Sequence, residues 1–131
     1  MNQRLAHISL LVRDYDEAIR YYTSVLGFEL IEDTILSPEK RWVLVKPRGA
    51  DNSCMLLLAK AATPAQSKSI GNQTGGRVFL FLHTDNFERD YRLYTENGVL
   101  FVREPVVESY GKVAVFSDLY GNLWDLIEPS K

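Results

Sequence analysis

Three side chains in this sequence draw attention because their chemistry is scarce or unusually placed. His7 and His83 are the only histidines, and an imidazole can bind a divalent metal ion or take up a proton near neutral pH. Asp125 lies inside the otherwise apolar run 123–127. A carboxylate in apolar surroundings is costly unless it is paired, hydrogen-bonded or bound to a metal. The pattern indicates either a metal site, for which His7 and Asp125 would be the ligands, or a metal-free hydrogen bond between them.

A second group of residues could bind a small organic molecule. Phe79, Phe81 and His83 alternate along one predicted strand, and Arg77 has the same parity, so we expect all four on one face. His83 could be a third ligand, a general base or a capping group for Asp85. Arg77 could hold a carboxylate of the bound molecule or lie in solvent. These alternatives stay open at this point.

Further candidates come from other strands and from a loop. Leu56 and Trp42 could join the phenylalanines in an apolar wall, or they could be ordinary core residues. Tyr110, before Gly111, could donate its hydroxyl to a bound molecule or contact a partner chain. Cys54 is the only cysteine, so a disulfide within the chain and a cysteine metal cage are both excluded. We interpret it as a buried, unreactive thiol.

The composition narrows the class of partner. The 131 residues are 46% hydrophobic and 24% charged, with a net charge of -2, which is an ordinary globular mixture. Acidic and basic residues are interspersed, so we expect neither nucleic acid nor a membrane as a partner. The sequence has no apolar run of membrane-spanning length, and its first residues lack the pattern of a signal peptide. We therefore expect a cytoplasmic protein.

The elements that must position these residues form a pattern that occurs twice. In the first half we predict strands at 7–12, 28–31, 41–46 and 54–59 and a turn at 47–52. The helix between the first two strands begins at the cap Asp14, with Glu17 completing a capping box, and ends at Gly27. In the second half we predict strands at 78–83, 99–102, 112–116 and 123–127 and a turn at 118–122. Its helix runs from the cap Asp85 to Asn97.

This internal repeat predicts one α+β domain over residues 1–131, made of two βαβββ modules. We expect the first module over about 4–60, a flexible connecting loop over 61–76, and the second module over about 77–129. Each helix can cover only one face of its sheet, so the other face needs cover as well. Two curved, mixed sheets facing each other would form a groove, which is a usual site for a small molecule.

The sequence resembles the vicinal oxygen chelate superfamily of glyoxalases, bleomycin resistance proteins and extradiol dioxygenases. The resemblance rests on 7–12, on 14–22 with 25–28, and on the closing run 118–129 (Asp-Leu-Tyr-Gly-Asn-Leu-Trp-Asp-Leu-Ile-Glu-Pro). It implies paired βαβββ modules, a homodimer, a small-molecule ligand and a divalent metal such as Zn, Ni, Mn or Fe. The four metal positions of the superfamily fall on His7, Leu56, Phe79 and Asp125.

Two hypotheses follow from this partial ligand set. Leucine and phenylalanine cannot donate to a metal, so the four-ligand set of glyoxalase I is half absent and the dioxygenase set is incomplete. The first hypothesis is a metal-assisted isomerase, lyase or dioxygenase that keeps His7 and Asp125 as remnant ligands of a weak site. The alternative is a metal-independent protein that sequesters an antibiotic or another small molecule, as bleomycin resistance proteins do. We favour the first hypothesis and assign no reaction.

Overall fold

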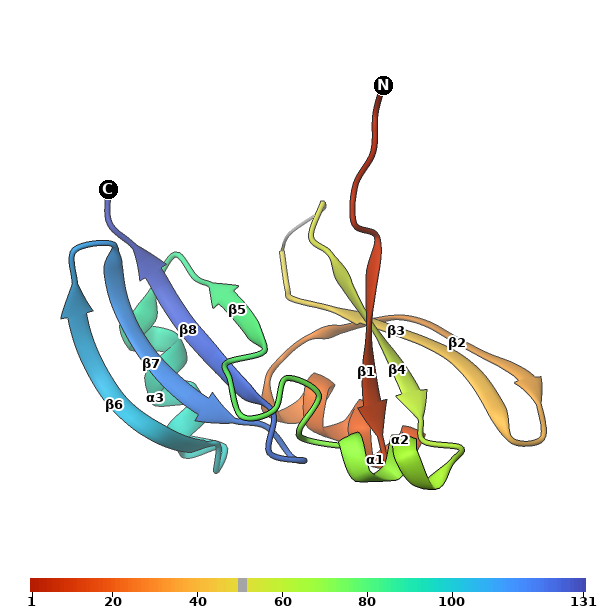
Figure 1. The fold of residues 1–131 in the computed structure, drawn as a ribbon. Helices are drawn as coiled ribbons and strands as arrows, with labels where there is room; N and C mark the ends of the chain where they lie inside the picture. Colours follow the sequence, from red (N-terminus) through yellow and green to blue (C-terminus); the bar gives the residue numbers. More distant parts are fainter. Residues whose placement is uncertain (50–51) are drawn as a thin grey trace. The chain divides into compact units, whose positions relative to one another are not determined.

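The chain divides into two compact units, each built around its own four-stranded sheet (Figure 1). The computed structural model describes residues 1–49 and 52–131. Unit 1 spans Met1–Ile70 and unit 2 spans Gly71–Lys131, so the boundary falls within the predicted connecting segment. No helix among the described residues is long and apolar enough to cross a membrane.

Unit 1 follows the predicted order of elements. Its elements are β1 (His7–Val12), α1 (Tyr15–Arg20), η1 (Tyr21–Val25), β2 (Glu29–Ser37), β3 (Lys40–Lys46), β4 (Met55–Lys60) and α2 (Pro64–Ser69). The strand order is β1-β4-β3-β2, with β1 parallel to β4 and the other pairs antiparallel. The predicted turn at 47–52 includes residues 50 and 51, which lie outside the described residues.

Unit 2 repeats this arrangement. Its elements are β5 (Leu80–His83), α3 (Phe87–Glu96), β6 (Leu100–Glu108), β7 (Gly111–Ser117) and β8 (Leu123–Pro129). The strand order is β5-β8-β7-β6, again with one parallel pair, β5 with β8. β2 and β6 are both nine residues long, and β3 and β7 are both seven. The predicted α+β fold with two βαβββ units is therefore confirmed.

The helix ends show which local predictions were correct. The Asp14 carboxylate accepts a hydrogen bond from the Glu17 backbone N–H at 2.8 Å, as a cap should. Gly27 and Gly98 both have the left-handed φ, 75° and 84°, that ends a helix. In unit 2 the cap is Asn86, whose side chain accepts from the Arg89 N–H.

Two local predictions need correction. Asp85 is one residue too early to cap α3, and its carboxylate forms an ion pair with Arg89 instead. The segment 61–76 is not wholly a loop, because α2 begins after the cap Thr63 with Pro64 in its first turn. The last turn of the first helix widens into the π-helix η1, where Thr23 donates its hydroxyl to the Ile19 carbonyl.

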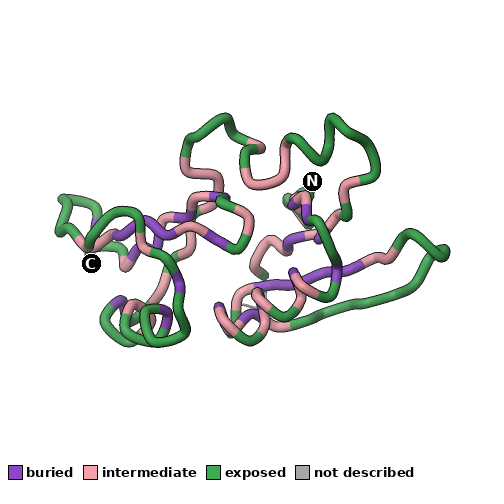
Figure 2. Tube along the Cα trace, turned by 90° about the horizontal axis from the view of Figure 1, so that it is seen from below, coloured by how far each residue is buried: buried purple, intermediate pink, exposed green. Residues whose placement is uncertain are grey.

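Each sheet is packed against a helix on one face. In unit 1 the Arg41 guanidinium lies over the Tyr15 ring of α1, 5.1 Å from its centroid, which places α1 on the side of β3 that carries Arg41, Val43 and Val45. In unit 2 Tyr94 of α3 contacts Phe116 edge to face at 5.5 Å. In Figure 2 the buried residues lie on strands and on helices in each unit, whereas β2 is exposed over almost its whole length.

Candidate ligand-binding faces

The face of the first sheet opposite α1 carries His7 and Trp42. We call it the distal face of unit 1 and define it by the alternate residues His7, Trp42, Leu44, Met55 and Leu57. Strand register supports the grouping, since His7 pairs with Met55 and Leu44 pairs with Leu57, and paired residues in a sheet point the same way. The His7 and Trp42 rings meet edge to face, with centroids 6.1 Å apart. The structure thus brings these two predicted residues together.

Leu56 does not belong to this face. It pairs with Ile8 and Val45, which point towards α1, and it is only 4% exposed. Its side chain is therefore part of the core of unit 1, on the side of the sheet opposite His7. The sequence prediction that placed Leu56 beside a bound molecule needs correction, because it was assigned by likeness to a family position and not by strand register.

The face of the second sheet opposite α3 carries most of the other predicted residues. We call it the distal face of unit 2. Phe81 pairs with Asp125, Asp125 pairs with Val115, and Val115 pairs with Arg103, so one row crosses all four strands. A second row consists of His83, Ile127, Val113 and Val106. The middle of both rows is apolar, because Val113, Val115 and Ile127 have aliphatic side chains, and Val115 and Ile127 are buried.

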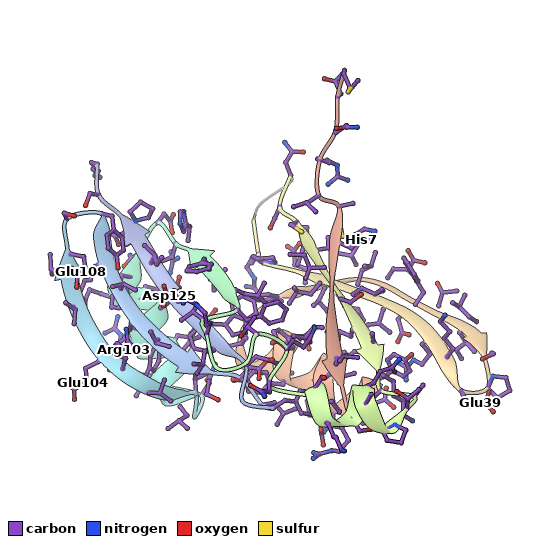
Figure 3. All side chains as sticks on the ribbon, viewed as in Figure 1. His7, Glu39, Arg103, Glu104, Glu108 and Asp125 are labelled. Carbon is purple, nitrogen blue, oxygen red and sulfur yellow. The ribbon has the colours of Figure 1, made fainter. Side chains whose placement is uncertain are left out.

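Asp125 is the carboxylate at the centre of this face. Burial raises the pKa of its side chain above the usual value, and the Arg103 guanidinium lowers it in part. Asp125 forms no ion pair with any residue that the structure describes. Arg103 therefore lowers the pKa of Asp125 by electrostatic attraction without direct contact. The carboxylate is half-buried and open to a hydrogen bond from a bound molecule. Figure 3 shows Asp125 on β8 and Arg103 towards β6.

The remaining predicted residues border the same unit. His83 is exposed at the end of β5. Phe79 precedes that strand, and its backbone N–H donates a hydrogen bond to the Leu123 carbonyl of β8. This bond continues the pairing of β5 with β8, so Phe79 keeps the alternation that places it on the same face as Phe81. Arg77 is exposed in the segment before β5, with its carbonyl accepting from the Thr74 hydroxyl.

Tyr110 stands apart from the two rows of unit 2. It lies in the turn between β6 and β7 and is 56% exposed. Its backbone carbonyl accepts a hydrogen bond from the Ser130 N–H, which ties this turn to the residues that follow β8. The structure therefore places its phenol at one end of the sheet.

Sequence reasoning missed Arg103. The predicted strand ended at Val102, whereas β6 continues to Glu108. Shifts in the pairing register on both sides of Arg103 interrupt the simple alternation, so parity counted from Phe101 alone would not place Arg103 correctly. The first half offered no signal for the longer strand, because its matching strand β2 is also nine residues long but was predicted only over 28–31.

Neither unit by itself supplies the donor set of a divalent metal centre among its described residues. His7 has Met55 as its paired neighbour and Trp42 as its ring contact, and neither offers the carboxylate or imidazole that such ions prefer. Asp125 has Phe81 and Val115 as paired neighbours and a cation in the same row. Within neither unit do three histidine, cysteine or carboxylate side chains of the described residues gather into a metal-holding group. Catalytic sites normally use three protein ligands.

Comparison with known proteins identifies the family. A model of the Glyoxalase/Bleomycin resistance protein/Dioxygenase superfamily matches residues 4–126. An uncharacterized protein of Shewanella frigidimarina is 57% identical over 98% of this chain and 95% of its own length. Among solved structures, UcmS2 is 32% identical with a TM-score of 0.83, covering 98% of this chain and 99% of its own.

A further similar structure has a described role. TnmS3 from a Streptomyces species, an antibiotic binding protein, is 30% identical with a TM-score of 0.79, and the match covers 98% of each chain. The resemblance seen in the sequence is confirmed by these matches and by the two mixed sheets. This chain belongs to the Glyoxalase/Bleomycin resistance protein/Dioxygenase superfamily.

Proposed function

We propose that this protein binds a flat, largely apolar organic molecule and holds it without changing it chemically. The observation that carries the proposal is Phe81, which is 62% exposed on the distal face of unit 2. It lies in the same row as the Asp125 carboxylate and the apolar side chain of Val115. When a second aromatic ring covers a solvent-exposed ring beside an apolar surface, the complex is stabilised.

Two further points support binding over catalysis. TnmS3, which is similar along nearly the whole chain, is described as binding an antibiotic. In this chain the family position in the second half is Phe79, which offers apolar surface in place of a metal ligand. Both points favour a sequestering protein whose ligand is aromatic.

The metal-assisted alternative rests on His7 and Asp125. His7 lies on the first sheet and Asp125 on the second, and they are the two family metal positions that carry a metal-binding side chain. Together they give two ligands, whereas a catalytic centre normally has three. We place this function second, and the same experiment tests it through a chelator.

The test is a thermal-shift screen of the full chain against a library of aromatic compounds, with and without EDTA. We expect several compounds to raise Tm by a few degrees, because binding only the folded state stabilises it. EDTA should not reduce the shift, and Phe81→Ala should abolish most of it. Leu93→Ala, which removes an exposed apolar side chain from α3, is the matched control and should leave the shift unchanged. Mass spectrometry should recover the ligand intact.

The outcomes separate the two functions. No stabilising compound in the library, or shifts that Phe81→Ala leaves unchanged, would overturn the binding proposal. Shifts that disappear in EDTA and return with Zn, Ni, Mn or Fe(II), together with conversion of the ligand, would establish the metal-assisted function instead.

We also propose that the protein is a homodimer in the cytoplasm. Two of the edge strands, β2 and β6, each expose several apolar side chains, which a second copy would cover. The reduced thiol expected of Cys54, the only cysteine, is compatible with a reducing compartment.

A further inference from the structure

We propose that Asp125 and Arg103 bind the two polar ends of one ligand, whose aromatic middle lies over Val115. The inference rests on the proposed small-molecule binding and names the ligand class. The class is an aromatic acid that carries a hydrogen-bond-donating group, such as a phenolic hydroxyl, at the end opposite its carboxylate. No metal enters this mode of binding.

Strand register fixes the arrangement. Arg103 of β6 pairs with Val115 of β7, and Val115 pairs with Asp125 of β8, so the three side chains lie on one face in one row. Asp125 and Arg103 are therefore two strand spacings apart, roughly 10 Å between their backbones. Val115 between them is 3% exposed and presents an apolar floor. Two fused aromatic rings match a space of this length.

Both charged groups are available to a ligand. Several other charged side chains of the protein form ion pairs, such as Arg41 with Asp33 at 2.7 Å and Lys46 with Glu29 at 2.8 Å. Asp125 and Arg103 form no ion pair with any residue in the described ranges 1–49 and 52–131. Glu104, which Figure 3 labels beside Arg103, is not paired with that guanidinium.

The chemistry of the two groups selects the ends of the ligand. A guanidinium presents a planar set of donors that matches a carboxylate with two parallel hydrogen bonds. An ionised aspartate can only accept, so it selects a hydroxyl or an N–H group. Half-burial deprives the Asp125 carboxylate of part of its water, and a ligand hydroxyl would restore that hydrogen bonding. Phe81, paired with Asp125 on the other side, would contact the ring edge.

The experiment compares three naphthalene probes by isothermal titration calorimetry on the full chain. 6-Hydroxy-2-naphthoic acid carries both polar ends, 2-naphthoic acid lacks the hydroxyl, and 2-naphthol lacks the carboxylate. We expect the first to bind about tenfold or more tighter than either of the others, the scale of one charge-assisted hydrogen bond. The measurement is made at neutral pH, where the naphthoic carboxyl groups are ionised.

Variants assign each polar end. Arg103→Gln should bring the affinity for 6-hydroxy-2-naphthoic acid down to that for 2-naphthol and leave the hydroxyl preference intact. Asp125→Leu should remove the hydroxyl preference and leave the carboxylate preference intact. If the leucine protein does not fold, Asp125→Asn is the second variant, and it should weaken the hydroxyl preference without removing it, because the amide oxygen is a neutral acceptor. Arg92→Gln removes the same charge from α3 and is the matched control, expected to bind all three probes like the wild type.

The results separate this inference from the function on which it rests. The inference is overturned if the wild type binds the three probes equally, or if the preferences survive Arg103→Gln and Asp125→Leu. It is also overturned if no naphthalene probe binds although other aromatic compounds stabilise the protein in a Phe81-dependent way. In these cases the proposed function stands. If no aromatic compound at all stabilises the protein, the proposed function fails as well.

Discussion

At the scale of single residues, Asp125 carries the sharpest prediction about stability. Burial raises the pKa of this carboxyl in the folded protein, whereas the unfolded chain has the ordinary value of 3.8. The folded state therefore holds its proton more tightly, and stability is lost as the pH rises from the unfolded pKa through the folded one. Asp125→Asn should consequently stabilise the protein at pH 7, by on the order of 1 kcal/mol.

The advantage of the same substitution should shrink as the pH falls below 3.8, because the carboxyl then becomes protonated in the unfolded chain as it does in the folded one. Urea unfolding of both proteins at pH 7 and pH 3.5 measures the difference. An Asp125→Asn protein that is less stable than wild type at pH 7 would show that the carboxylate is satisfied in the native state.

Residue-level prediction from the sequence succeeded where chemistry alone was informative. An aspartate inside an apolar strand and the parity of Phe79, Phe81 and His83 were readable from residue types and alternation. Leu56 was misplaced, since a family position does not specify which face of β4 a side chain occupies. Arg103 was missed because pairing irregularities in β6 depend on its partner strand.

At the scale of elements, the cap of α3 offers a direct comparison. The Asn86 side chain accepts a hydrogen bond from the Arg89 N–H, so Asn86→Ala should destabilise the protein by about 1 kcal/mol, like Asp14→Ala in the first half. Asp85→Ala should change stability little, because the ion pair between Asp85 and Arg89 is exposed to solvent. Urea unfolding midpoints measure all three, and a larger effect at Asp85 than at Asn86 would restore the sequence assignment.

The turn before β8 should be more sensitive to substitution. The buried Asp118 carboxylate accepts hydrogen bonds from the backbone N–H groups of Tyr120 and Asn122 and from the Asn122 side chain. Asp118→Ala leaves these donors without their partner, which should cost about 2 to 4 kcal/mol in unfolding free energy. Asp118→Asn keeps one acceptor oxygen and should fall in between. A loss below 1 kcal/mol for the alanine variant would mean that the turn does not depend on this side chain.

Element prediction was limited by tertiary effects more than by local signals. Strand cores and both glycine helix ends were readable, because alternation and left-handed φ have direct sequence signatures. The outer halves of β2 and β6 were not, since an edge strand extends as far as its neighbour allows. α2 had a signal, Thr63 followed by Pro64, that a polar composition obscured.

At the scale of the whole molecule, the repeat was the most reliable inference. Two halves with matched spacing predicted two units with the same strand order, and each sheet has one parallel and two antiparallel pairs. The groove and the module boundaries stay predictions, because nothing in a repeated pattern determines how one unit is placed against its copy.

The edge strands lead to the prediction about assembly. β2 and β6 each lie at the end of a sheet, and both expose apolar side chains, such as Ile35 at 75% and Val107 at 78%. An exposed apolar edge favours association unless it is covered. We expect a dimer at micromolar concentration by size-exclusion chromatography with light scattering.

Charge placed on these edges should weaken the dimer. The double variant Ile35→Lys and Val107→Lys should shift the protein towards the monomer, because a buried lysine must give up its hydration. Leu93→Lys, an equivalent change at an exposed position of α3, should leave the dimer intact. A monomeric wild type, or a dimer that the double variant leaves unchanged, would place the assembly surface away from β2 and β6. A dimer lost only in Leu93→Lys would point to α3.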